Sequence, residues 1–135
     1  PFPDAEPTLS ELRRRGYKLG LITDTDGTPG LKRNRISKIP LLKFFEIVIV
    51  AGEDTPQPKP DPQPFLLVAS KLGVKPNECV VVGDKPYTDV RGAKAAGMIS
   101  VRVFRRRWHD EEPADYTINS LTQLIDLLPV LSRQG

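Results

Sequence analysis

Two acidic residues follow a short apolar run in the second half of the chain. Asp84 comes directly after Gly83, which ends the valine run 80–82, and Asp89 follows five positions later. A β-branched run of this kind predicts a strand that is buried on both faces. Open α/β sheets bind ligands at the carboxyl ends of such strands, and carboxylate oxygens suit a hard cation such as Mg2+. Asp84 and Asp89 are therefore candidate metal ligands; the same pattern also fits a strand-to-helix turn that Asp84 caps.

A hydroxyl group and an ammonium group follow two other apolar runs. Thr23 ends the run 18–23, and Lys59 lies in the proline-rich stretch after the run 45–50. If the strands are parallel, these two side chains and the two acids meet at the same edge of the sheet. A hydroxyl donor, a fixed cation and a metal site can together bind a phosphoryl group and stabilise the charge that develops during its transfer. The ordered set therefore predicts a phosphoryl-transfer site.

Strand-like and helix-like segments alternate along the chain and must position these residues. Strands are expected at 18–23, 45–50, 79–82, 99–104 and 115–118. Helices are expected at 5–15, 30–38, 62–72, 87–96 and 121–131. This alternation predicts one α/β domain over residues 1–135, with a mostly parallel sheet.

The composition is that of an ordinary globular domain. The 135 residues are 39% hydrophobic and carry a net charge of +3, which does not by itself indicate a nucleic-acid partner. The arginines at 105–107, followed by Trp108, are interpreted as a solvated loop. The one cysteine, Cys79, is expected in the core and fits a reducing compartment such as the cytoplasm. No apolar stretch approaches the roughly 20 residues of a membrane span.

The motifs resemble those of the haloacid dehalogenase (HAD) superfamily of Mg2+-dependent phosphatases and their relatives, from Pro3 to Leu128. Its second motif, a strand that ends in Thr or Ser, matches Thr23, and its third, a Lys often within Lys-Pro-x-Pro, matches residues 59–62. Its fourth, Gly-Asp-x-x-x-x-Asp, matches residues 83–89. The resemblance implies a three-layer α/β/α Rossmann-like core that hydrolyses a small phosphorylated metabolite.

The resemblance also implies a role for each matched residue. Asp84, and Asp89 through water, would hold Mg2+, and Lys59 would orient the nucleophile and offset charge. The Thr23 hydroxyl and nearby backbone amides would hold a phosphoryl oxygen. An aspartyl-phosphate would form on the first Asp of the family's Asp-x-Asp motif and then hydrolyse.

No strand carrying that Asp-x-Asp motif precedes Thr23 in this sequence. The resemblance implies that the nucleophile strand and the cap lie upstream, so the chain is expected to be an incomplete core that is inactive alone. The nucleophile strand would run between the strand of Thr23 and the strand of Asp84. Without it two strand edges have unpaired backbone groups, which are expected to bind the missing N-terminal segment or a second copy of the chain.

Two alternatives remain open. Residues 24–28 spell Asp-x-Asp-Gly-Thr, so Asp24 could be the nucleophile and Asp26 the acid and base of a compact phosphatase. The order of elements favours the other interpretation, because Lys59 follows the very next strand, where the third motif belongs. Asp24 is then a substrate-binding residue whose charge is unfavourable beside a phosphate. The second alternative is a non-catalytic HAD-fold binding or regulatory module.

Overall fold

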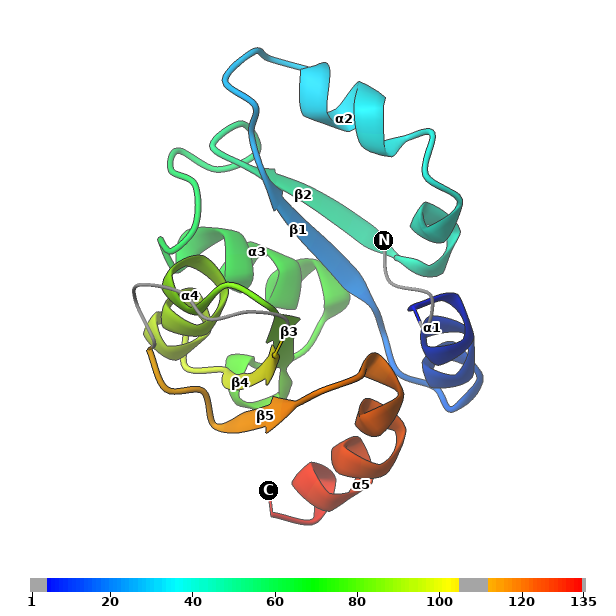
Figure 1. Cartoon of the computed structure of the whole chain (residues 1–135). Helices are drawn as coiled ribbons and strands as arrows, with labels where there is room; N and C mark the ends of the chain where they lie inside the picture. Colours follow the sequence, from blue (N-terminus) through cyan, green and yellow to red (C-terminus); the bar gives the residue numbers. More distant parts are fainter. Residues whose placement is uncertain (1–4, 105–111, 135) are drawn as a thin grey trace.

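The computed structural model describes residues 5–104 and 112–134, so the arginines at 105–107 and Trp108 lie outside the described residues. The helices are α1 (Ala5–Arg14), α2 (Leu31–Ile36), α3 (Gln63–Leu72), α4 (Arg91–Ala95) and α5 (Leu124–Gln134). The strands are β1 (Gly20–Asp24), β2 (Ile47–Ala51), β3 (Val80–Gly83), β4 (Ile99–Val103) and β5 (Tyr116–Ile118). The predicted alternation of strands and helices is confirmed, with boundaries shifted by a few residues (Figure 1).

The strands form two parallel sheets, which confirms the predicted parallel arrangement. One sheet contains β1 and β2, and the other contains β3, β4 and β5 in that order. Thr23 pairs with Val50 in the first sheet, and Gly83 pairs with Arg102 in the second. Within the described residues, β1 and β3 each have a single neighbouring strand, so each has one open edge.

The open edges explain a correction, which concerns burial. The valine run of β3 was predicted to be buried on both faces, but Val82 is 37% exposed and its two neighbours are half-buried. All five residues of β1 are likewise half-buried. By contrast, Val50 in β2 and Val101 in β4 are fully buried. The two strands expected at the centre of the sheet are only partly buried because nothing in the described chain covers their facing edges.

Helices cover both faces of the strands, which gives the predicted three-layer arrangement. The first apolar cluster joins α1 and α5 to β4 and β5 through Leu12, Val101, Val103, Ile118, Leu124, Leu128 and Leu131. The second joins α3 and α4 through Phe65, Ala69, Ala93, Ala96 and Met98. Figure 1 shows α3 and α4 together, apart from α1 and α5. Gly92 permits the close approach of α4, because a Cβ there would lie 2.6 Å from Cζ of Phe65.

The helix predicted at 87–96 is interrupted. It starts as a π-helical turn, η3 (Pro86–Val90), and continues as α4. Both Asp89 and Val90 donate their backbone N–H to the Lys85 carbonyl, which widens the turn. Such turns are frequent at functional sites. Here the widened turn brings Asp89 back over the end of β3, because a Cβ on Gly83 would lie 2.6 Å from Cβ of Asp89.

The remaining short turns are 3-10 helical: η1 (Pro40–Phe44), η2 (Pro76–Glu78) and η4 (Leu121–Gln123). The last of these forms the first part of the helix predicted at 121–131. Cys79 follows η2 and is half-buried rather than fully in the core; burial, and then the charge of Glu78, raise the pKa of its thiol. None of the helices in the described residues is long and apolar enough to cross a bilayer.

Candidate functional site

Lys59 and Asp89 form an ion pair at the carboxyl ends of the strands. The Lys59 ammonium lies 2.8 Å from Oδ1 of Asp89, and the two side chains are 14% and 13% exposed. The other carboxylate oxygen of Asp89 accepts a hydrogen bond from the Lys85 backbone N–H at 3.2 Å. Attraction between opposite charges is stronger away from bulk water, so this pair fixes both side chains. Sequence order alone had predicted that these two residues would meet at one edge.

Lys59 also binds the end of β1. Its backbone N–H donates to Oδ1 of Asp24 at 2.9 Å. The residue therefore connects Asp24, the last residue of β1, with Asp89, which follows β3. Thr23 lies beside them at the end of β1, half-buried, and its hydroxyl makes no hydrogen bond within residues 5–104 and 112–134.

Asp84 lies at the carboxyl end of β3, where the sequence placed it. Its side chain is half-buried and has no hydrogen-bond or ion-pair partner in the described part of the chain. It does not cap the following turn: Lys85 occupies the N-cap position, and no side chain caps that turn. A half-buried carboxylate without a partner is a fitting ligand for a hard cation.

The rest of a cation site is not assembled from these residues. No group of three or more histidine, cysteine or acidic side chains that could hold a metal ion occurs among the described residues. Asp89 is ion-paired with Lys59, so it is better suited to bind Mg2+ through a water molecule than to ligate the ion directly. The residues present therefore fit Mg2+ when water, substrate or another segment supplies further oxygens.

Asp26 binds α2 rather than Lys59. Its carboxylate forms ion pairs with Lys32 at 3.1 Å and with Arg35 at 2.8 Å, both on α2. Burial by itself would raise the pKa of Asp26, but the hydrogen bonds from Lys32 and Arg35 lower it on balance. The two acids of the compact alternative thus have different partners, since Asp24 binds Lys59 and Asp26 binds α2. An acid held ionised by two cations is poorly suited to donate a proton.

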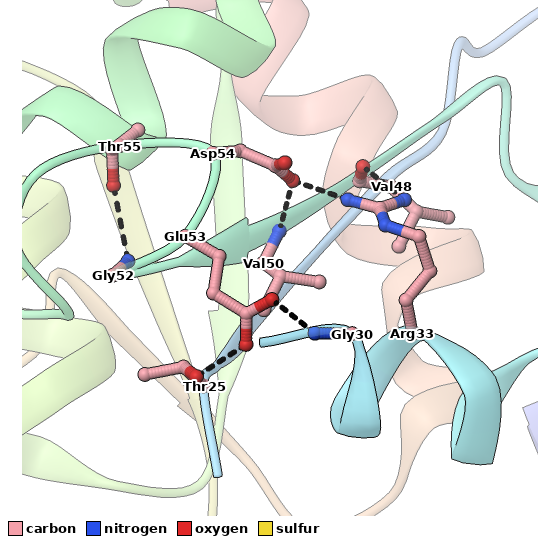
Figure 2. A network of polar contacts seen from close by, with 9 residues as sticks. All are labelled: Thr25, Gly30, Arg33, Val48, Val50, Gly52, Glu53, Asp54 and Thr55. Carbon is pink, nitrogen blue, oxygen red and sulfur yellow. Dashed lines mark hydrogen bonds and ion pairs between the residues drawn. The ribbon is translucent and has the colours of Figure 1, made fainter. Parts of the chain in front are cut away.

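A network of polar contacts on the same edge had no counterpart in the sequence-based prediction. Figure 2 shows the turn after β2, whose Glu53 reaches the loop after β1 and whose Asp54 reaches α2. Glu53 accepts hydrogen bonds from the Gly30 backbone N–H at 2.9 Å and from the Thr25 hydroxyl. These two bonds, in that order, lower the pKa of the Glu53 carboxyl.

Asp54 forms the second limb of the network. It accepts a hydrogen bond from the Val50 backbone N–H at 2.7 Å and pairs with Arg33 of α2. The available sequence signal was two consecutive acids after a glycine at a strand end, a pattern common in turns. Apart from Val50, their partners lie more than 20 residues away along the chain, so the sequence did not indicate these contacts.

Comparison with known proteins identifies the family. A model of the haloacid dehalogenase-like hydrolases matches residues 1–97. The chain belongs to this family. The resemblance drawn from the motifs after β1, β2 and β3 is therefore confirmed.

The curated relatives that match include phosphatases, and the matching solved structures also include a 2-haloacid dehalogenase from Pseudomonas syringae pv. Tomato, with a TM-score of 0.79 and 30% identity over 99% of the chain and 54% of that structure. The chain is 37% identical to a glyceraldehyde 3-phosphate phosphatase of Methanopyrus kandleri, over 98% of the chain and 58% of that protein. It is 42% identical to a phosphoserine phosphatase of Thermus thermophilus, over 77% of the chain and 41% of that protein. The crystal structure of a HAD phosphatase from Thermococcus onnurineus matches with a TM-score of 0.83 and 40% identity, over 94% of the chain and 57% of that structure. The chain thus spans about half the length of the curated relatives it matches.

Within this HAD chain, the predicted site residues divide into two groups. In the first group, Lys59 contacts both Asp24 and Asp89. Thr23 lies next to Asp24 in β1, and Asp84 lies at the end of β3. Asp26 is bound to α2. The catalytic and metal-binding roles of these residues remain predictions.

Proposed function

We propose that the protein is a Mg2+-dependent phosphatase that hydrolyses a small phosphorylated metabolite. The observation that carries this proposal is the position of Lys59 at the carboxyl ends of β1 and β3. Its backbone N–H binds Asp24, and its side-chain ammonium binds Asp89. A fixed cation at this edge can offset the negative charge of a transferring phosphoryl group. The named phosphatases among the relatives support the same reaction class.

The side chains present would act on the phosphoryl group as follows. The Thr23 hydroxyl, which has no partner among the described residues, donates to a phosphoryl oxygen. The Lys59 ammonium, held beside Asp89, orients the attacking carboxylate and offsets charge. Asp84, with Asp89 through water, would hold Mg2+, which neutralises the phosphate oxygens.

The attacking group is the carboxylate of an Asp in an upstream strand, as in the family the chain belongs to. Its oxygen forms a bond to phosphorus while the bond to the ester oxygen breaks, and a second acid protonates the departing alcohol. Water then hydrolyses the aspartyl-phosphate and releases inorganic phosphate. We place this strand between β1 and β3, because both have an open edge and incomplete burial there.

The same open edges lead to a prediction for the chain by itself. Expressed as these 135 residues, it is expected to form dimers or larger species, because unpaired strand edges bind other strands. Size-exclusion chromatography with light scattering measures this directly. A stable, monodisperse monomer of 15.0 kDa would contradict the assignment of an upstream strand to this position.

The proposal is tested by assaying the full-length gene product for phosphate release. Substrates would include p-nitrophenyl phosphate and a panel of small phosphate esters of sugars, hydroxy acids and amino acids. Release that requires Mg2+ and stops with EDTA is the expected result. Absence of hydrolysis across the panel would favour the alternative, a non-catalytic binding or regulatory module.

Replacement of Asp24 by asparagine separates the proposal from the compact phosphatase. The amide oxygen of asparagine can still accept the Lys59 N–H, and the change removes a negative charge close to the phosphate. We expect Asp24→Asn to keep kcat within about threefold of wild type, or to raise it. Loss of all activity in this variant, measured with the same ester, would instead identify Asp24 as the nucleophile.

A further inference from the structure

The turn after β2 packs against the loop that follows β1 and leads into the segment that carries Lys59. Gly52 turns the chain with φ of 90°, and the N–H groups of Glu53 and Asp54 fold back onto the Val50 carbonyl at 3.1 and 2.8 Å. The turn packs directly on the loop after β1, because a Cβ on Gly52 would lie 2.8 Å from Cγ2 of Thr25. The Glu53 side chain therefore starts from a rigid backbone.

Glu53 holds both ends of the loop after β1. One carboxylate oxygen accepts from the Thr25 hydroxyl at the start of the loop, and the other accepts from the Gly30 N–H at its end (Figure 2). The Thr25 hydroxyl oxygen also accepts from the Gly27 N–H at 3.0 Å. A single carboxylate thus binds two points of the loop directly and reaches a third, Gly27, through the Thr25 hydroxyl. Hydrogen bonds to an ionised group are about twice as strong as neutral ones.

Thr25 lies next to the residues proposed to meet the substrate. Its backbone N–H donates to the Ala51 carbonyl at 2.9 Å, which extends the pairing of β1 with β2 by one step. Asp24 and Thr23 precede it directly, and Asp24 accepts the Lys59 N–H. The segment from Glu53 to Lys59 therefore binds the end of β1 at two points: Glu53 binds Thr25, and Lys59 binds Asp24.

We propose that Glu53 is a positioning residue, which acts through Thr25 to set Thr23 and Asp24 against Lys59. This inference rests on the proposed phosphatase function. Glu53 contacts Thr25 and Gly30 and none of the residues assigned to the phosphoryl group or to Mg2+. Small displacements of a positioning group cost rate because the transition state tolerates less error than the bound substrate.

The experiment is a double-mutant cycle in the full-length protein, assayed with p-nitrophenyl phosphate and Mg2+. Glu53→Ala is expected to lower kcat by about 10-fold while KM changes by less than about threefold. Thr25→Val, which removes the hydroxyl at nearly constant volume, is expected to give a similar loss. The double variant should be no slower than Glu53→Ala alone, because both changes break the same connection.

Two further variants separate positioning from stability. In Glu53→Gln the amide oxygen can accept the Gly30 N–H and the amide N–H can donate to the Thr25 hydroxyl oxygen, so both connections are kept and kcat is expected to recover to within about threefold of wild type. Glu46→Ala is the matched control, since Glu46 is exposed, precedes β2, and has no side-chain hydrogen bond or ion pair within the described residues. Melting temperatures measured alongside show whether any variant is unfolded at the assay temperature.

The outcomes are distinct. Losses from Glu53→Ala and Thr25→Val that multiply in the double variant would overturn the inference, as would a full-rate Glu53→Ala enzyme or an equal loss in Glu46→Ala. A wild-type protein that shows no Mg2+-dependent hydrolysis overturns the proposed function and the inference together. A Lys59→Met variant that is slow beside a full-rate Glu53→Ala variant overturns the inference alone.

Discussion

Replacing Lys59 with methionine is expected to slow phosphoester hydrolysis at saturating substrate by about 100-fold or more. Methionine keeps most of the length of the side chain but removes the ammonium that lies 2.8 Å from Asp89. Without that charge, the developing negative charge on the phosphoryl oxygens loses a fixed partner. The carboxylate of Asp89 is also left largely buried without its cation, which misplaces it for any role beside Mg2+.

The measurement is kcat of the full-length protein with Mg2+, compared with a lysine that the site does not use. Lys71→Met provides this control, because Lys71 is exposed in the last turn of α3 and has no side-chain hydrogen bond or ion pair among the described residues. Circular dichroism and a melting curve establish that each variant is folded at the assay temperature. A Lys59→Met enzyme with a near-normal kcat would remove Lys59 from the mechanism.

The strand ends and their chemistry could be predicted from the sequence because the signal is local. Apolar runs stop at a polar residue, as at Thr23 and Asp84, and the run lengths fit strands. Parallel pairing then places all the carboxyl ends at one edge, which is why Lys59 and Asp89, 30 residues apart, could be expected to meet. This part of the argument needs the order of elements and no side-chain detail.

Burial and loop contacts could not be predicted in the same way. The valines of β3 have the composition of a doubly buried strand, yet Val82 is exposed, because burial depends on a neighbouring strand. The π-helical turn at 86–90 breaks a segment that looks continuous in sequence. Glu53 resembles an ordinary turn residue, and its role depends on Gly30 and Thr25, which lie 23 and 28 residues earlier. These features depend on tertiary packing rather than on local sequence pattern.

Replacing Gly83 with alanine is expected to lower kcat by about 100-fold through Asp89 rather than through the backbone of β3. A Cβ at this position would lie 2.5 Å from Cγ and 2.6 Å from Cβ of Asp89, closer than carbon atoms can approach. The Gly83 backbone does not have a positive φ, so alanine causes no strain in the strand itself. The added methyl group must therefore push Asp89 and its π-helical turn away from the Lys59 ammonium.

The kinetics should show the displacement of Asp89 in two ways. Half-maximal activity is expected to require a higher Mg2+ concentration, because Asp89 is proposed to hold the cation through water. Gly83→Ala combined with Asp89→Asn should be no slower than Asp89→Asn alone, because the methyl group then displaces a side chain whose charge is already gone. Lys71→Met is again the control, since Lys71 is exposed in the last turn of α3 and lies away from the open edge of β3. Full activity in Gly83→Ala, or losses that multiply with those of Asp89→Asn, would show that the position of Asp89 over Gly83 does not matter for the reaction.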